Sequence, residues 1–350
     1  MNNLFYELCN ADAIASNEYE VRDLLYKELR QFADDVYCDK LGSLIFHKKG
    51  RHDRNLKIMI TAHMDEVGFM VRHIDEYGFI YLHKVGGSLD KGLNNQLMRI
   101  TTFEGEKIVG YMNLKKDIDG KITDYYLDIA AFNQDEVKRR GVAVGNMVTF
   151  NSVAQDINGD VIAAKAIDDR VGCYVLAELI KETNLENDVY FVMSSSEEVG
   201  MRGAKTSASL IEPDVIFAID VANNHEMDHS FKNHRKIGHG IMLEHYDKTM
   251  SPNIKLVELV KKIAIENKVM FQEDMFGNGG TDAGYSHLVN SGSLAMVLGV
   301  PLRYCHTSYS YVHKKDVESM IKLLKHLVSE KKESYMYCLD YLGGKNNDRN

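Results

Sequence analysis

The sequence contains no tryptophan, only three prolines, and five cysteines scattered along 350 residues without a CxxC pair. This pattern argues against a disulfide framework and against a zinc site made of thiolates. No apolar run approaches the roughly 20 residues that a membrane-spanning helix needs. The first residues also lack the basic and apolar segments of a secretory signal. We therefore expect a cytoplasmic protein with reduced thiols, in which histidine and carboxylate side chains are the available metal ligands.

Positive charge is also in deficit. The chain has 42 lysines and arginines against 51 aspartates and glutamates, a formal net charge of -9. This balance argues against a general nucleic-acid binder and against a protein that binds anionic membranes. The 45% of apolar and 27% of charged residues are ordinary for a globular chain, and the length indicates two domains.

Apolar runs typical of buried strands alternate with amphipathic helical patterns, which predicts an α/β fold. Four of these runs end at, or a few residues before, a side chain that can bind a metal. They are 56–61, followed by His63; 188–193, followed by Glu197 and Glu198; 214–219, followed by Asp220; and 293–298, followed by His306. Open α/β sheets bind ligands beyond the carboxyl ends of their strands. We therefore expect these side chains to gather at one edge of the sheet.

The segment 69–162 has a different character, with short alternating runs between glycine and asparagine turns. One amphipathic helical piece, from Asn133 to Arg140, interrupts these runs. The α/β pattern resumes afterwards. We therefore predict a small β-rich domain, 69–162, inserted into a domain made of 1–68 and 163–350. Because its loops hold no catalytic cluster, partner contact is its expected role.

Two helix starts follow from capping patterns. Asn17 is expected to cap a helix that runs to about Phe32. Ser251 is expected to cap a helix through Glu266, with Pro252 in its first turn.

The adjacent Glu197 and Glu198 lie where a strand ends and a loop containing Gly200 begins. Neighbouring side chains at a strand end point in different directions, so one can bind a metal while the other handles a proton. Asp65, two residues after His63, can accept a hydrogen bond from the second ring nitrogen of that histidine. This contact would fix the tautomer in which the imidazole is a good ligand.

Six residues form the candidate site: His63, Asp168, Glu197, Glu198, Asp220 and His306. Two histidines and three carboxylates suit two divalent ions of the zinc, cobalt or manganese kind that share a bridging aspartate. The remaining glutamate would act as the general base in the hydrolysis of an amide. His313 competes with His306, but it lies closer to the last helix. A loop with His225, His229 and His234 is interpreted as surface.

Five ordered motifs, 61–68, 166–172, 197–204, 219–221 and 303–306, carry a resemblance that spans nearly the whole chain. The chain resembles the tetrahedral (TET) and glutamyl aminopeptidase family of co-catalytic two-metal peptidases, of which some members are labelled endoglucanase-like. The resemblance implies a mixed-sheet α/β/α metallopeptidase domain of the phosphorylase/hydrolase-like kind with an inserted β domain. It also implies dimers, a hollow dodecamer and peptide substrates.

The resemblance also implies roles for individual residues. They are His63 and Asp220 on one metal, Glu198 and His306 on the other, Asp168 as the bridge, Glu197 as the general base, Asp65 as the residue that orients His63, and Gly280, Thr281 and Asp282 near the substrate. A cis peptide is expected between Asp168 and Asp169. One departure concerns the segment after Asp220, where the family continues with an Asp-Thr-Pro-Gly type sequence. Residues 223–229 lack this proline, so substrate preference does not carry over.

The leading hypothesis is a metal-dependent aminopeptidase. A metal-dependent deacylase or carboxypeptidase acting on small amides would use the same site on another substrate. The third hypothesis is a metal-bound assembly or regulatory protein without enzymatic activity, which the complete set of ligands and base disfavours.

Overall fold

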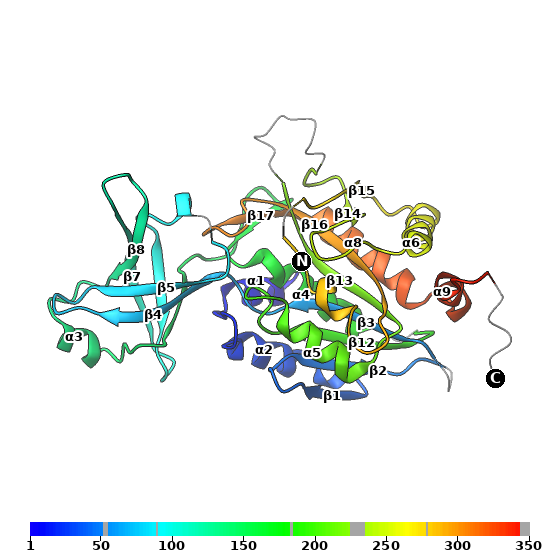
Figure 1. Cartoon of the computed structure of the whole chain (residues 1–350), viewed down its shortest axis with the longest axis horizontal. Helices are drawn as coiled ribbons and strands as arrows, with labels where there is room; N and C mark the ends of the chain where they lie inside the picture. The colour runs from blue at the N-terminus through cyan, green and yellow to red at the C-terminus, as the bar shows by residue number, and fades with distance from the viewer. Residues whose placement is uncertain (52–54, 89, 183–184, 225–234, 278, 344–350) are drawn as a thin grey trace.

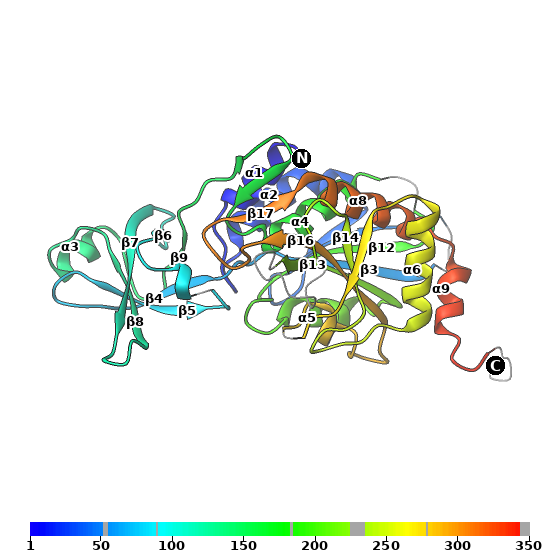
Figure 2. The ribbon, with the colours of Figure 1, turned by 90° about the horizontal axis from the view of Figure 1, so that it is seen from above.

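The structure is a computed structural model that describes residues 1–51, 55–88, 90–182, 185–224, 235–277 and 279–343. It consists of an α/β body and a small β-barrel that projects from one side of it (Figures 1 and 2). The loop with His225, His229 and His234 falls outside the described residues. None of the helices described in these ranges is long and apolar enough to cross a membrane.

Eleven strands in the described ranges form one mixed sheet, which confirms the predicted fold class. In spatial order nine of them are β1 (Asp35–Cys38), β2 (Leu44–Lys48), β12 (Asp188–Ser194), β3 (Lys57–His63), β13 (Val215–Asn224), β16 (Leu294–Arg303), β17 (Ser310–His313), β11 (Val161–Ala164) and β10 (Gln155–Asp156). β14 (Ile241–Glu244) pairs with β16 and with β15 (Phe271–Asp274). The four central strands β12, β3, β13 and β16 run parallel. Their carboxyl ends therefore meet at one edge of the sheet.

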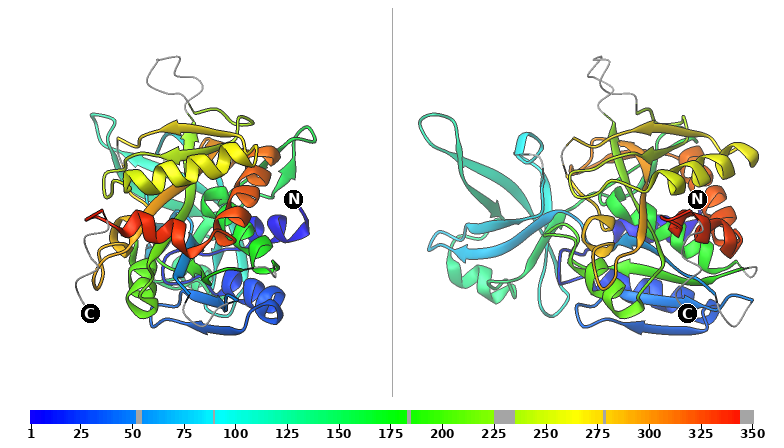
Figure 3. Two further views of the ribbon diagram at one scale, coloured as in Figure 1. Left: turned by 90° about the vertical axis from the view of Figure 1, so that its right-hand side faces the viewer. Right: turned by 45° about the vertical axis from the view of Figure 1, so that its right-hand side comes forward.

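Helices cover both faces of this sheet, because its central strands are apolar on both sides. In β3, Ile58 and Ile60 pack into one core while Met59 between them packs into another. The first core includes residues of α1 (Asn3–Asn10), α2 (Tyr19–Leu29), α4 (Ile167–Ile180), α6 (Ile254–Glu266), α8 (Lys314–Val328) and α9 (Lys332–Leu339). The second includes residues of α5 (Arg202–Ile211) and α7 (Ala283–Ser286). The left panel of Figure 3 shows α6 and α9, in yellow and red, at the end away from the barrel.

The barrel is closed by six antiparallel strands, so it leaves no open sheet edge. In spatial order they are β4 (Gly68–Ile74), β5 (Ile80–Val85), β8 (Ile122–Asp128), β7 (Lys107–Lys116), β6 (Leu97–Thr101) and β9 (Met147–Phe150). A separate apolar core fills the barrel and includes Val137 of α3 (Gln134–Arg139). The predicted β-rich character is confirmed, while the limits 69–162 stay a prediction. Short 3-10 helices span Arg30–Phe32 and Asp90–Gly92.

Both expected helix caps are wrong, for local reasons. α2 begins at Tyr19, and the carboxylate of the preceding Glu18 accepts the backbone N–H groups of Ser16 and Ser196 instead of capping the helix. α6 begins at Ile254, where the Asn253 side chain accepts the N–H of Lys255 at 2.8 Å. Asparagine is at least as good a cap as serine, so the helix starts later than Ser251 suggests.

Candidate active site

Two imidazoles flank one carboxylate at the carboxyl edge of the sheet. His63 ends β3, Asp168 lies in the first turn of α4, and His306 follows β16. Nε2 of His63 lies 3.1 Å from Oδ1 of Asp168, and Nε2 of His306 lies 3.0 Å from Oδ2 of the same residue. Asp168 and Asp169 are joined by a cis peptide, as expected. Asp168 therefore presents one oxygen to each histidine.

The other predicted carboxylates lie around this centre. Oε1 of Glu198 is 3.5 Å from Nε2 of His306, and Oε2 of Glu197 is 4.0 Å from Nε2 of His63. Donor atoms of His63, Asp168 and Asp220 lie within 4.8 Å of one another. The parallel register of β12 and β3, which pairs Ser194 with His63, brings the Glu197 loop to this point. All six candidate residues therefore come together, although they are far apart in the sequence.

The donor set fits a divalent cation. Oε1 of Glu198 is buried and accepts no hydrogen bond from any residue in the described ranges. Burial raises the pKa of Glu198 to about 7 and the pKa of Glu197 well above its usual range. Burial also acts on Asp168, but hydrogen bonds from His306 and His63 outweigh it and hold the Asp168 pKa well below normal. Crowded buried carboxylates of this kind are costly without a nearby positive charge.

Asp65 acts differently from the expectation. Nδ1 of His63 bonds the Asp65 backbone carbonyl at 2.9 Å, whereas the nearest carboxylate oxygen of Asp65 is 3.7 Å away. That carboxylate instead accepts the backbone N–H groups of Glu197 at 2.9 Å and Glu198 at 3.1 Å. Asp65 therefore orients the imidazole through its main chain, and its side chain positions the loop that carries both glutamates. This contact occupies Nδ1 and leaves Nε2 of His63, which faces Asp168, as the nitrogen available to a metal.

A cavity of about 580 Å³ opens above the site, within the 300–1,000 Å³ range of small-ligand pockets. Gly280 and Thr281 line it, while their expected place near a substrate stays a prediction. Asp282 is not among the lining residues of this cavity. It is buried below, where its carboxylate accepts the hydroxyl hydrogen bonds of Thr61 at 2.8 Å and Ser194 at 2.5 Å. Its carboxylate therefore links β3 to β12 through these two hydrogen bonds.

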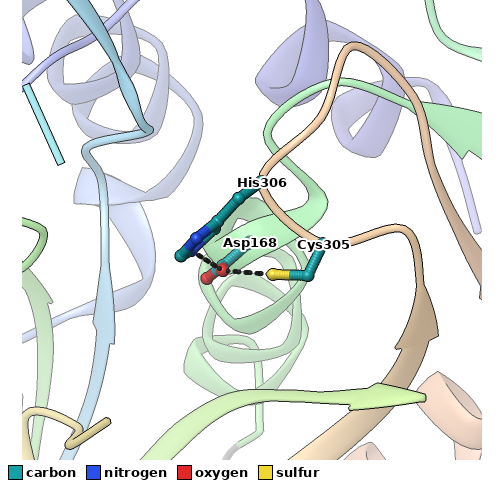
Figure 4. A group of neighbouring side chains, drawn as sticks. All are labelled: Asp168, Cys305 and His306. Carbon is teal, nitrogen blue, oxygen red and sulfur yellow. Dashed lines mark hydrogen bonds and ion pairs between the residues drawn. The ribbon is translucent and has the colours of Figure 1, made fainter. Parts of the chain in front are cut away.

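Sequence reasoning missed two contributors. The Cys305 thiol is 2.9 Å from Oδ2 of Asp168, and Figure 4 shows it beside His306 at this carboxylate. The backbone carbonyl of Gly87, from the loop after β5 of the barrel, faces Nδ1 of His306 at 3.2 Å. The adjacency of Cys305 to His306 was a signal for the first, but nothing in the sequence indicated the second. The competing His313 accepts the Lys315 N–H at the start of α8 and does not line the cavity.

Histidine and carboxylate donors at the ends of parallel strands, beneath an open cavity, are the arrangement expected of a metal-dependent enzyme on an α/β/α body. Comparison with known proteins then places the chain further. It belongs to the M42 glutamyl aminopeptidase family, whose model matches residues 42–323. The chain is therefore a peptide-bond hydrolase, and the resemblance seen in its motifs is confirmed.

The relatives are similar over nearly their whole length. The putative aminopeptidase FrvX of Escherichia coli strain K12 is 34% identical, over 92% of this chain and 93% of its own. The crystal structure of a TET aminopeptidase from Thaumarchaeota archaeon SCGC AB-539-E09 has a TM-score of 0.91 at 32% identity, covering 96% and 98% of the two chains. The Pyrococcus horikoshii TET1 peptidase, described as assembling into a tetrahedron or a large octahedral shell, has a TM-score of 0.84 at 27% identity, covering 93% and 98%.

Proposed function

We propose that this protein is a two-metal aminopeptidase that removes N-terminal residues from peptides. His63 and Asp220 would hold one ion, Glu198 and His306 the other, and Asp168 would bridge them. The observation that carries this proposal is the Asp168 carboxylate, which turns one oxygen to each histidine at 3.1 and 3.0 Å. Bound zinc, cobalt or manganese ions would polarise the scissile carbonyl and lower the pKa of a water molecule.

Glu197 is the proposed general base. Its side chain is 11% exposed and lines the cavity, so it can meet a water molecule and a peptide there. The backbone N–H of Glu197 is held by Asp65, which fixes where this side chain starts. The carboxylate would take a proton from the attacking water and return it to the leaving amine, a step typical of peptide hydrolysis.

The free amino terminus of the substrate distinguishes the proposal from its alternative. Glu198 and Asp220, which line the cavity, would be occupied by the proposed ions, so the substrate itself must separate the two functions: an aminopeptidase needs a free α-amino group, and a deacylase needs an acylated one. We expect the enzyme, supplied with zinc, cobalt or manganese, to cleave peptides with a free N-terminus and to leave the matched N-acetylated peptides intact. Liquid chromatography with mass spectrometry would measure both. Preferential cleavage of the acetylated set would favour the deacylase or carboxypeptidase, and no turnover of either set would contradict the proposed aminopeptidase.

We also propose that the inserted domain, residues 69–162, mediates dimerisation and that the dimers build a hollow dodecamer. The shells described for the Pyrococcus horikoshii relative support this, as do the exposed apolar side chains of Phe103, Ile118 and Phe132 in this domain. We expect light scattering with size-exclusion chromatography to give a mass near twelve chains, and a monomer at all concentrations would contradict the proposal.

The five free cysteines support a place in the reducing cytoplasm.

A further inference from the structure

Cys305 and His306 are neighbours in the chain, yet both side chains reach the same carboxylate. Adjacent side chains in an extended strand point to opposite sides. Here Tyr304 and His306 both have φ of 61°, which is uncommon for residues other than glycine. This backbone turns the two side chains toward Asp168, as Figure 4 shows. The positive φ angles of Tyr304 and His306 are therefore what lets two adjacent side chains reach one carboxylate.

The Cys305 sulfur lies inside the donor set. Sγ donates to Oδ2 of Asp168 at 2.9 Å, and the same oxygen is 3.0 Å from Nε2 of His306. The donor atoms of these three residues lie within 4.8 Å of one another. Cys305 is only 6% exposed, and the surface that it does expose lines the cavity.

A second observation, made on Glu198, points to a cation at the same place. Oε1 of Glu198 is buried, lies 3.5 Å from Nε2 of His306, and accepts no hydrogen bond from the part of the chain that the structure describes. A buried anionic oxygen without a donor calls for a cation nearby. The thiol and the imidazole both contact the Asp168 carboxylate, and this oxygen lies beside the imidazole, so one cation would lie near all three groups.

We propose that Cys305 is an additional ligand of the ion that Glu198 and His306 hold. This inference builds on the two-metal site of the proposed function but does not depend on peptidase activity. When the sulfur binds, its S–H bond breaks and the proton is released to solvent, as in other thiolate sites. The ion held by His63 and Asp220 has no sulfur in its donor group, so the two halves of the site differ.

This difference has a chemical consequence. Thiolate ligands favour soft and borderline ions, whereas manganese prefers carboxylate and water. The half with Cys305 should therefore prefer zinc or cobalt, and the half with His63 should be less selective. In the competing interpretation the thiol keeps its proton and only holds Asp168 in place.

Cobalt distinguishes these two cases by absorption. The full-length protein is freed of metal with a chelator and titrated with cobalt chloride. Any bound cobalt gives weak visible bands, but only a cobalt–thiolate bond adds a strong charge-transfer band in the near ultraviolet. We expect this band in the wild type and its loss in Cys305→Ser. The matched control is Cys173→Ser, because Cys173 is also buried near the site but donates to the backbone carbonyl of His63.

The zinc affinity gives a second measurement. In Cys305→Ser we expect zinc binding at one of the two sites to weaken by at least about tenfold, and manganese binding to change less. If this variant does not fold by circular dichroism, X-ray absorption of the zinc-loaded wild type replaces it, with a sulfur neighbour expected at about 2.3 Å.

Visible cobalt bands without the charge-transfer band in the wild type would overturn the role of Cys305 and leave the two-metal site intact. The same band at full strength in Cys305→Ser would also overturn it. A protein that binds no cobalt at all would instead refute the two-metal site, and the inference with it.

Discussion

Glu197→Gln is expected to lower kcat for peptide hydrolysis by a factor of about 10² to 10⁴ while the protein keeps its metal. The amide has the size of the carboxylate but cannot accept the proton of the attacking water. The backbone N–H of Glu197 stays bonded to Asp65, so the loop should keep its place and Glu198 its role as a ligand. Peptide turnover at saturating substrate measures kcat, and elemental analysis by mass spectrometry measures the metal content.

Glu258→Gln is the matched control for this experiment, because Glu258 is exposed on α6, away from the cavity. It should turn over peptides at the wild-type rate. Full activity of a metal-loaded Glu197→Gln protein would refute the assigned base. Loss of metal together with activity would instead make Glu197 a ligand and would require a different base.

The second large effect is expected at Asp12, which joins the body to the barrel. Asp12 follows α1 in the body and is fully buried. Its carboxylate accepts hydrogen bonds from the barrel side chains of Arg99, at 2.7 and 2.5 Å, and Lys107, at 2.7 Å. On the body side, Nζ of the fully buried Lys165 lies 3.1 Å away. The Asp12 carboxylate therefore pairs with cations of the barrel and with a cation of the body.

Asp12→Asn should destabilise the protein by about 3–5 kcal/mol, the usual result when one partner of a buried ion pair is removed. The asparagine keeps the shape of the side chain but leaves Lys165 and Arg99 without their shared counter-charge. Urea unfolding, followed by circular dichroism, measures the free energy of unfolding. Glu20→Gln is the matched control, since Glu20 pairs with Lys107 near the surface and should contribute no more than about 1 kcal/mol. Equal effects of the two variants would contradict a dominant role for burial.

The stability difference between the wild type and Asp12→Asn should depend on pH in a definite direction. Burial favours the neutral form of Asp12, but Lys165 and Arg99 outweigh it and hold the Asp12 pKa well below its usual range. A pKa that is lower in the folded state stabilises the protein above the unfolded value of about 3.9, and this stabilisation is lost as the pH falls. The difference in free energy of unfolding between the wild type and Asp12→Asn should therefore be constant above about pH 5 and should become smaller as the pH falls further.

The sequence predicted the centre of the site well because strand ends are local features. An apolar run followed by a histidine or carboxylate can be read from one segment, and parallel strands then bring such ends together. His63, Glu197 and His306 were found in this way, and the structure places them around Asp168. The family resemblance assigned them separate roles, which stay predictions until the variants are measured.

What the sequence could not show depends on contacts across the fold. The Asp65 carboxylate turned to the N–H groups of the Glu197 loop, and Asp282 was drawn down to the hydroxyls of Thr61 and Ser194. The hydrogen-bond partners of both side chains depend on distances between strands, which cannot be predicted from one segment of sequence. Cys305 was set aside as one of five scattered cysteines. Its adjacency to His306 was a signal, but the left-handed backbone of Tyr304 and His306, which aims both side chains at Asp168, could not be predicted from the residue types.

The Gly87 carbonyl at His306 has a practical consequence for anyone who wishes to shorten this enzyme. A trimmed catalyst made of the α/β body alone would contain every proposed metal ligand and the general base. It would nevertheless lack the acceptor that holds the ring of His306 from behind. The shortened protein should therefore bind the ion of Glu198 and His306 more weakly than the full chain. Any variant in which the barrel is removed or replaced would need another acceptor in place of the Gly87 carbonyl oxygen.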